Sequence, residues 1–336
     1  MNPRRMGRSS LLVSELCLGT MMFGDQTEAA AAADIVAMAR ERGVNFIDTA
    51  DVYSRGASES MLGPLLESDR DRWVLASKVG NPMSRKPNAS RYSRKWLIQA
   101  LDASLARLRT DYLDIWYLHR DFEDGGDEEM LYTIADLIRA GRIRYWGLSN
   151  FRGWRIATLC AMAERMGMPG PIVCQPYYNL LNRQPEVEIL PSCAHHGLGV
   201  TPYSPVARGV LTGKYAPGSA APEGSRAGRG DRRILETEWR EESLLIAQRL
   251  KAHAEARGIT LLQFAVAWLL ANRVVSSVIA GPKTVEQFAD YFGALDYQWS
   301  DEDEALVDSL VTPGHASTPG YHDPQYPFRG RLLHTF

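Results

Sequence analysis

Cysteine is scarce in this chain, and long apolar segments are missing. The four cysteines lie far apart and form no CxxC pair: Cys17, Cys160, Cys174 and Cys193. This usage argues against a disulfide framework and against a zinc ribbon. No run of roughly 18 apolar residues occurs, so the sequence predicts no membrane-spanning segment. The N-terminal stretch is apolar only over a short, broken segment, so it predicts no signal peptide and we expect a cytoplasmic protein.

A strong excess of charge of either sign is also missing. The formal net charge is -2 and the sequence pI is near 6.4, which favours neither a nucleic acid nor a membrane surface as a partner. Apolar residues, in contrast, are plentiful, because 45% of the 336 residues are hydrophobic and 23% are charged. A chain of this length and composition can bury a large core as one domain.

Short apolar runs alternate with longer helical patterns along the chain. The eight runs are ELCLGT, VNFIDTA, WVLASK, LDIWYLH, IRYWGLSN, IVCQP, GVTPYS and SSVIAG. Several amphipathic segments between them end at a glycine, for example Gly43, Gly141 and Gly167, as helix C-termini commonly do. Strand-and-helix units in this number favour a closed (β/α)8 TIM barrel of the α/β class over an open doubly wound sheet. We therefore predict a single (β/α)8 domain over residues 1–336.

Two segments interrupt this alternation. Residues 214–233 are rich in Gly, Pro, Ala and Arg and are predicted to form a long loop. Most of its arginines are expected to lie in solvent, and Arg226 is the candidate for a contact with a cofactor phosphate. Residues 313–336 are predicted to form an irregular C-terminal tail. Its aromatic residues Tyr321, Tyr326 and Phe328 either wall a pocket or pack against the barrel exterior.

Ionisable residues stand where the early strands are predicted to end. Asp48 lies near the end of the second run, with Tyr53 just beyond it. Lys78 closes the third run and His119 closes the fourth. One polar residue at a strand end is more often a turn former or a cap than a functional group. The carboxyl ends of barrel strands share one rim, however, and this rim would carry a carboxylate, a phenol, an ammonium and an imidazole together.

These side-chain types suit the reduction of a carbonyl group. An ammonium near a phenol lowers the pKa of the phenol, and a carboxylate holds the ammonium charged, so Tyr53 can act as a general acid beside Lys78 and Asp48. A neutral His119 can donate a hydrogen bond to the carbonyl oxygen. Because no side chain supplies hydride, the reaction requires a nicotinamide cofactor.

The later strand ends suit such a cofactor. Ser149, Asn150 and Gln175 offer the donors and acceptors that a carboxamide needs. Tyr203 offers a flat ring on which a nicotinamide can stack. No G-x-G-x-x-G motif follows a predicted strand, which argues against a Rossmann site.

An anion site is predicted after the last run. A strand stops at Gly281 and a helix starts near Thr284, so backbone N–H groups and Lys283 would face an anion. The alternative is an ordinary Gly-Pro turn followed by a helix cap.

Several motifs together resemble the aldo-keto reductase superfamily. The most specific are GVNFIDTADVYSRGASE, LASKVG, YLDIWYLHR, GLSNF, QPYYNLLNR and YSPVARGVLTGKY. The last three are similar to the longer-chain bacterial reductases and to the potassium-channel β subunits. The resemblance implies an NADP-dependent oxidoreductase that reduces an aldehyde or ketone reversibly, with NADPH lying across the barrel mouth. It implies a catalytic tetrad of Asp48, Tyr53, Lys78 and His119 with Tyr53 as the general acid.

The resemblance also implies a set of cofactor-binding residues. Those at the nicotinamide end are Gly19, Thr20, Met21, Asp48, Ser149, Asn150, Gln175 and Tyr203. Those at the pyrophosphate and adenosine are Ser204, Pro205, Val206, Ala207, Arg208, Lys214, Arg226, Gly281, Lys283, Gln287 and Asp290. Lys283 stands where a basic residue would pair with a 2′-phosphate, which favours NADPH over NADH. Asp290 and Tyr291 replace the Glu-Asn that the family often carries near the adenine, so the chain departs from the pattern there.

Two other functions remain as alternatives. A regulatory subunit that senses NADPH would bind it through the same strands; channel β subunits replace the tetrad histidine, whereas this chain keeps His119. A metal-dependent barrel isomerase is disfavoured because no carboxylate and histidine cluster has metal-ligand spacing, and we predict no metal. The expected partner is a small carbonyl compound, with Asp121 and Phe122 as candidates for its pocket. No motif indicates an oligomeric state.

Overall fold

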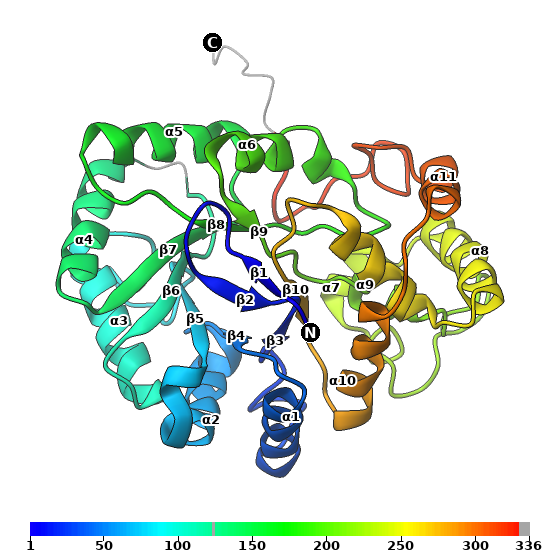
Figure 1. Cartoon of the computed structure of the whole chain (residues 1–336), viewed down its shortest axis with the longest axis horizontal. Helices are drawn as coiled ribbons and strands as arrows, with labels where there is room; N and C mark the ends of the chain where they lie inside the picture. The colour runs from blue at the N-terminus through cyan, green and yellow to red at the C-terminus, as the bar shows by residue number, and fades with distance from the viewer. Residues whose placement is uncertain (123–124, 329–336) are drawn as a thin grey trace.

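The computed structural model describes residues 1–122 and 125–328. Within them, an eight-stranded parallel sheet curls round and carries helices on its outside (Figure 1). In spatial order the strands are β10 (Val278–Ala280), β3 (Leu16–Gly19), β4 (Phe46–Asp48), β5 (Val74–Val79), β6 (Leu113–Leu118), β7 (Ile143–Ser149), β8 (Val173–Gln175) and β9 (Gly199–Val200). Each of the predicted apolar runs overlaps one of these strands.

The two edges of the sheet meet between β9 and β10. Val200 forms a parallel bridge with Val275, just before β10. Its N–H donates to Val274 O at 3.0 Å, and its carbonyl accepts from Ser276 N at 2.8 Å. The sheet is therefore closed, and the predicted (β/α)8 barrel is confirmed.

The helices surround the barrel and fill the segments between strands. They are α1 (Ala29–Glu41), α2 (Ala57–Leu66), α3 (Arg94–Leu108), α4 (Asp127–Arg139), α5 (Gly153–Arg165), α6 (Ile189–His196), α7 (Arg232–Thr237), α8 (Glu241–Ala256), α9 (Leu261–Ala271), α10 (Val285–Phe292) and α11 (Asp301–Leu310). Gly43, Gly141 and Gly167 follow α1, α4 and α5 with φ of 78°, 69° and 63°, so these predicted helix ends are confirmed.

No single helix in the described part of the chain is both long and apolar enough to cross a membrane. Only α8 and α9 taken together reach that length and composition, and they are bent by 91° where they join.

Side chains alternate between the inside of the barrel and the helix layer, because successive residues of a strand point to opposite faces. The inward residues form their own buried cluster with Cys17, Phe46, Val74, Ala76, Ile115, Tyr117, Val173 and Ile279. Leu18, Ile47 and Leu75, which alternate with them, belong to the larger cluster beneath the helices. Asp48 and Lys78 each come two residues after an inward-facing residue of the same strand. The two-residue period of a strand therefore places both side chains at the open end of the barrel.

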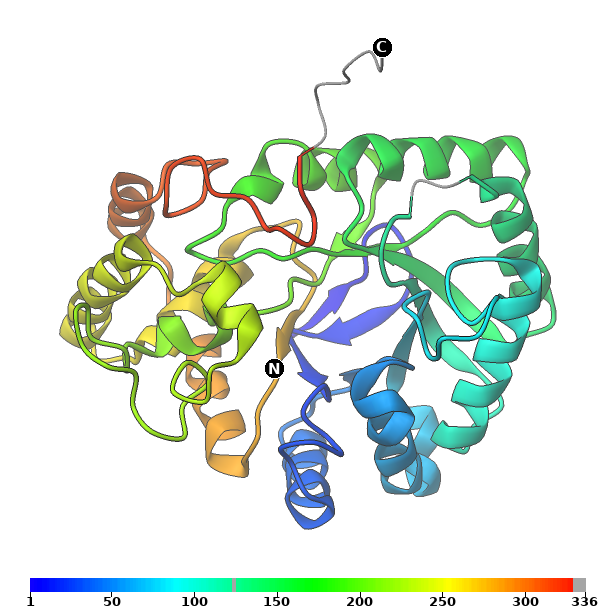
Figure 2. The ribbon, with the colours of Figure 1, turned by 180° about the vertical axis from the view of Figure 1, so that it is seen from behind.

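An N-terminal hairpin closes the opposite end. Its strands β1 (Pro3–Arg5) and β2 (Leu12–Ser14) pair antiparallel, and Met6 and Val13 join the interior cluster. The hairpin lies across the barrel in Figure 1, whereas Figure 2 shows the molecule from behind, with the C-terminal segment running over the loops of that face.

The two segments that were predicted to be irregular are largely so. Residues 214–231 contain turns, but α7 already begins at Arg232, because the Asp231 carboxylate caps it by accepting from Ile234 N at 3.1 Å. Beyond α11, residues 312–328 form no helix and run beside the segment after β8. There Arg183 N donates to His315 O at 2.8 Å. Residues 329–336 of the predicted tail lie outside the described residues.

Gly147 of β7 tests the packing inside the barrel. A Cβ atom there would lie 2.5 Å from Val173 Cγ1 and 2.8 Å from the ring of Tyr117. We expect Gly147→Ala to lower the free energy of unfolding by about 1–3 kcal/mol, because the close-packed interior cannot accept the methyl group without moving. The matched control is Gly170→Ala, whose Cβ meets no atom within 4 Å. Urea unfolding of both variants measures the difference, and equal midpoints would contradict this packing.

Candidate active site

The predicted catalytic residues meet at the open end of the barrel. Asp48 is the last residue of β4, Tyr53 begins a short 3-10 helix η1 (Tyr53–Gly56), Lys78 lies in β5, and His119 follows β6. Lys78 is fully buried and its Nζ donates to the Asp48 carboxylate, to Thr49 O at 2.9 Å and to the Tyr53 hydroxyl at 2.9 Å. These three acceptors match the three N–H donors of an ammonium group. The residues that sequence analysis singled out therefore form one connected cluster.

Burial and charge set the protonation of this cluster. Burial by itself lowers the pKa of Lys78, but Asp48 and Tyr53 outweigh it and raise that pKa above its ordinary value. Lys78 therefore stays charged. The Lys78 ammonium lowers the pKa of Tyr53 as predicted, yet burial has the larger effect, and the net pKa of the phenol is raised. Tyr53 consequently carries its proton at neutral pH.

His119 faces the phenol across the same space. The ring centroids of Tyr53 and His119 lie 6.0 Å apart with an interplanar angle of 81°. Burial, followed by the charges of Lys78 and Arg120, holds the pKa of His119 well below its usual value, so its imidazole is neutral. Its Nδ1 is buried and makes no hydrogen bond to any described residue. A neutral imidazole with an N–H available can donate to a substrate oxygen.

Sequence reasoning missed a set of buried hydrogen bonds, centred on Glu59, next to the site. The buried Glu59 carboxylate of α2 accepts from Ser77 Oγ at 2.5 Å and from Arg107 Nε at 2.7 Å. Ser77 precedes Lys78 in β5 and Arg107 belongs to α3, so these contacts join three elements next to the predicted catalytic residues. Glu59 closes the motif GVNFIDTADVYSRGASE, but its role depends on residues far away in the sequence.

Asp51 stands apart from the tetrad although it lies between Asp48 and Tyr53 in sequence. It is 1% exposed, and neither of its carboxyl oxygens hydrogen-bonds to a described residue. Burial, reinforced by the negative charge of Glu59, raises the pKa of Asp51 to about 8. The carboxyl is therefore mostly neutral at pH 7 and adds little charge beside Tyr53.

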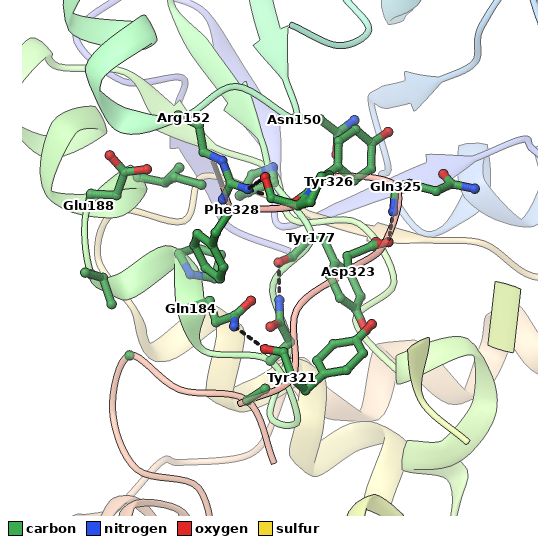
Figure 3. A pocket seen from close by; sticks show the side chains of 18 of the residues that line it. Asn150, Arg152, Tyr177, Gln184, Glu188, Tyr321, Asp323, Gln325, Tyr326 and Phe328 are labelled. Carbon is green, nitrogen blue, oxygen red and sulfur yellow. Dashed lines mark hydrogen bonds between the residues drawn. The ribbon is translucent and has the colours of Figure 1, made fainter. Parts of the chain in front are cut away.

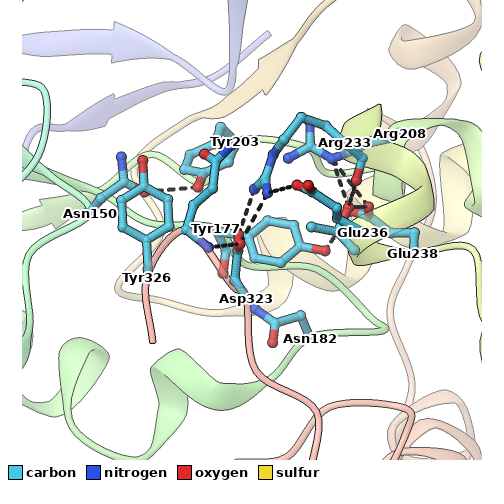
Figure 4. A network of polar contacts seen from close by, with 12 residues as sticks. Asn150, Tyr177, Asn182, Tyr203, Arg208, Arg233, Glu236, Glu238, Asp323 and Tyr326 are labelled. Atoms are coloured by element: carbon cyan, nitrogen blue, oxygen red, sulfur yellow. Dashed lines mark hydrogen bonds and ion pairs between the residues drawn. The ribbon is translucent and has the colours of Figure 1, made fainter. Parts of the chain in front are cut away.

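The residues predicted to bind the carboxamide form a hydrogen-bonded chain. Asn150 Nδ2 donates to His119 O at 3.0 Å and to Ser149 Oγ at 3.1 Å, and its Oδ1 accepts from the Tyr203 hydroxyl at 2.8 Å. Gln175 Nε2 donates to the Asp48 carboxylate at 2.9 Å. These contacts bring the polar strand ends into direct connection with the tetrad. Figure 4 shows Asn150 and Tyr203 beside Tyr326 of the tail.

Tyr203 and the loop after it have an unusual backbone. The Tyr203 ring stacks on Tyr177 with centroids 5.6 Å apart. Ser204, Ala207 and Arg208 have φ of 55°, 47° and 52°, the left-handed region that non-glycine residues rarely adopt. Such strain is often held at binding loops.

The rest of this loop lies close to α7. The Arg208 side chain is turned toward α7, where it pairs with Glu238 at 3.1 Å (Figure 4). Pro205 and Val206 lie in the same loop, and Lys214 is exposed just beyond it.

The first strand supplies three further predicted residues. Gly19 pairs in register with Asp48, and Thr20 N donates to Asp48 O at 2.9 Å. Thr20 is buried, whereas Met21 is 40% exposed.

The predicted anion site gathers positive charge. Burial, followed by the charges of Arg229, Arg226 and Lys214, lowers the pKa of Lys283. Hydrogen bonds also link this region, because Arg229 donates to Gln26 Oε1 at 2.6 Å and the neighbouring Thr27 Oγ1 donates to Lys283 O at 3.3 Å. Arg226 is paired with Asp231 at 2.9 Å, but neither Lys283 nor Lys214 forms an ion pair with a described residue.

Two of the predicted adenosine residues flank the start of α10. Gln287 Oε1 accepts from Lys283 N at 2.9 Å and Gly281 is exposed. The Asp290 carboxylate accepts from Gln263 Nε2 at 2.8 Å and from Thr260 Oγ1 at 3.2 Å. It is thus directed to the start of α9, and its contact with adenine stays a prediction.

A cavity of about 710 Å³ (Figure 3) opens next to Asn150 and Arg120, whereas the four tetrad residues are not among those that line it. Its wall includes Asn150 together with Asp121, Phe122, Tyr321, Tyr326 and Phe328. The tail aromatics therefore wall a pocket, which was one of the two predicted alternatives. Asp323 fixes this part of the tail by an ion pair with Arg233 at 2.6 Å.

Among the described residues, no cluster of three His, Cys, Asp or Glu side chains is arranged to hold a metal ion.

Known proteins resemble this chain over most of its length. Residues 15–312 match the Aldo/keto reductase family. A probable voltage-gated potassium channel subunit beta of Arabidopsis thaliana is 35% identical over 303 residues, covering 88% of this chain and 92% of that protein. The uncharacterized oxidoreductase YrpG of Bacillus subtilis is 33% identical over 325 residues, covering 94% and 97%. This chain therefore belongs to the aldo/keto reductase family.

Proposed function

We propose that the protein is an NADPH-dependent reductase that converts an aldehyde or ketone to an alcohol. The observation that carries this proposal is the 2.9 Å contact between the buried Lys78 ammonium and the Tyr53 hydroxyl at the open end of the barrel. Family membership supports oxidoreductase chemistry at this site.

Tyr53 is the proton donor in this proposal. Its raised pKa keeps the proton on the phenol until the carbonyl oxygen acquires negative charge. Lys78 then stabilises the phenolate that remains, and Asp48 with Thr49 O holds the ammonium in place. The nicotinamide cofactor, when bound, supplies the hydride.

His119 orients the substrate oxygen. A neutral imidazole donates an N–H to the carbonyl oxygen and stabilises the growing oxyanion without competing with Tyr53 as an acid. The two rings lie edge-on with centroids 6.0 Å apart, so one small carbonyl group could contact both the phenol and the imidazole.

The polar strand ends and the cations fit the two ends of a dinucleotide. Ser149, Asn150 and Gln175 would hold the carboxamide, and the Tyr203 ring would support the nicotinamide. The positive region around Lys283 would take the phosphates, including a 2′-phosphate. This fit supports NADPH as the cofactor.

A second candidate function is an NADPH-sensing regulatory subunit. The names of relatives in Arabidopsis thaliana and rice, both probable channel β subunits at 35% and 36% identity, favour it. The catalytic cluster with an intact His119 favours the reductase. Steady turnover of aldehydes by the isolated chain would separate the two functions.

Tyr53→Phe tests the assigned acid. We expect kcat for aldehyde reduction to fall by about 10²- to 10⁴-fold, because the ring remains while the proton is lost. NADPH affinity, measured by fluorescence titration, should be retained. The exposed Tyr132, 56% accessible on α4, provides the matched control Tyr132→Phe. Near wild-type turnover in Tyr53→Phe would show that another group donates the proton.

Lys283→Ala tests the choice of cofactor. We expect kcat/KM for NADPH to fall by about tenfold or more, because a charge-assisted contact to the 2′-phosphate is lost. The value for NADH, which lacks that phosphate, should change far less. Lys95→Ala, an exposed lysine on α3, is the control. Binding of each cofactor, followed by fluorescence, gives an independent readout, and an equal loss for both cofactors would contradict the assignment.

A further inference from the structure

Arg120 stands out among the half-buried arginines because its guanidinium makes neither a hydrogen bond nor an ion pair with any described residue. Arg155 pairs with Asp121 and Asp127, Arg183 pairs with Glu186 and Asp308, and Arg233 pairs with Glu236 and Asp323. Within residues 1–122 and 125–328, the Arg120 guanidinium forms no ion pair and no hydrogen bond, and its Nε is buried. An unpaired donor in such a position is costly unless a ligand satisfies it.

Arg120 lines the cavity and connects it to the predicted catalytic residues along the chain. It follows His119 directly, and its charge contributes to the lowered pKa of that imidazole. Its guanidinium lies over the rings of Phe122 at 5.5 Å and Tyr326 at 5.4 Å. Aromatic rings on two sides hold a guanidinium in position without neutralising its charge.

The backbone that carries Arg120 is fixed. Tyr92 Oη donates to Arg120 O at 2.5 Å and accepts from Arg120 N at 3.2 Å. The Tyr92 ring also contacts Phe122 edge-on, with centroids 5.3 Å apart. The guanidinium is therefore a preorganised group rather than a free surface side chain.

The other charged side chains described around the cavity do not neutralise Arg120, so an anion can bind next to its guanidinium. Asp121 and Asp323 are already paired with Arg155 and Arg233. Arg152 donates to Tyr326 O at 2.6 Å, so its charge too lacks a carboxylate partner among the described residues. Glu188, the remaining acid, lies on the opposite side of the cavity from Tyr326 (Figure 3). A planar guanidinium fits one carboxylate of a ligand. A second negative group on the same ligand, placed near Glu188, would be repelled by that side chain.

We propose that the substrate is an oxo acid, a carbonyl compound whose carboxylate binds Arg120 while its aldehyde or ketone reaches Tyr53 and His119. This inference rests on the proposed reductase function and names the substrate class of the same site. The apolar part of such a substrate would lie against Phe122, Tyr326 and Phe328, which line the same cavity.

Matched aldehydes test this substrate class. The 2-, 3- and 4-carboxybenzaldehydes are compared with the methyl-substituted benzaldehydes of the same shape, with NADPH as cofactor. We expect at least one acid to exceed its methyl counterpart by about tenfold or more in kcat/KM. In Arg120→Met this acid-to-methyl ratio should fall by about 10- to 100-fold, as expected for the loss of a charged hydrogen bond. Arg120→Lys should restore part of the ratio, since it keeps the charge without the planar fork.

The control is Arg139→Gln, which alters an exposed arginine on α4 that pairs with Asp136 and lies outside the cavity. Its ratio should equal that of the wild type. Equal kcat/KM for acids and methyl analogues in the wild type, or the same ratio in Arg120→Met, would overturn the proposal. A preference for 4-formylphenyl phosphate over every carboxybenzaldehyde would overturn the carboxylate in favour of a phosphate.

A binding measurement separates this inference from the proposed function. Calorimetric titration with 4-(hydroxymethyl)benzoate, with and without NADP⁺, needs no turnover. Binding that weakens about tenfold or more in Arg120→Met supports the anion site even if no aldehyde is reduced, in which case only the reductase proposal fails. Absence of binding, or binding indifferent to Arg120→Met, overturns the inference whatever the activity.

Discussion

The Lys78 ammonium inside the barrel is the constraint on which the site depends. A buried ammonium is stable only when acceptors surround it, and here Asp48, Thr49 O and Tyr53 take all its donors. The strand register places these groups, because Gly19 pairs with Asp48, Asp48 with Ala76, and Lys78 with Tyr117. The same interaction that holds the charge in place therefore also orients the phenol.

The electrostatics of the site follow from its depth. Burial keeps His119 neutral and Tyr53 protonated, and it leaves Asp51 mostly uncharged at pH 7. Among the described residues, the charges next to Tyr53 and His119 then include the paired Lys78 and Asp48, and Arg120, which has no ion-pair partner there. Positive charge also gathers around Lys283. A substrate or cofactor with negative groups would thus be attracted by Arg120 and by the cations around Lys283.

Much of the fold and the position of the tetrad residues could be predicted from sequence, because short apolar strand runs and helices ending at glycine have local signals. Lys78 and Asp48 were predictable for the same reason, since each lies at the end of an apolar run. The net pKa of Tyr53 was not, because burial depends on the whole barrel. The pairing of Arg208 with Glu238 and of Arg233 with Asp323 also could not be foreseen. Each joins an irregular segment to α7 or to the residue that ends it, and contacts of irregular segments leave no periodic trace in the sequence.

The proposed hydride transfer from NADPH to a carbonyl carbon can be tested with NADPH that carries deuterium at the nicotinamide C4 position. Incubation of the purified chain with both C4 diastereomers of the labelled cofactor and a neutral benzaldehyde, followed by mass spectrometry of the alcohol, locates the label. The proposed hydride transfer predicts a single deuterium on the former carbonyl carbon with one of the two diastereomers. Alcohol without deuterium from either diastereomer, or no alcohol from a chain that binds NADPH, would contradict it.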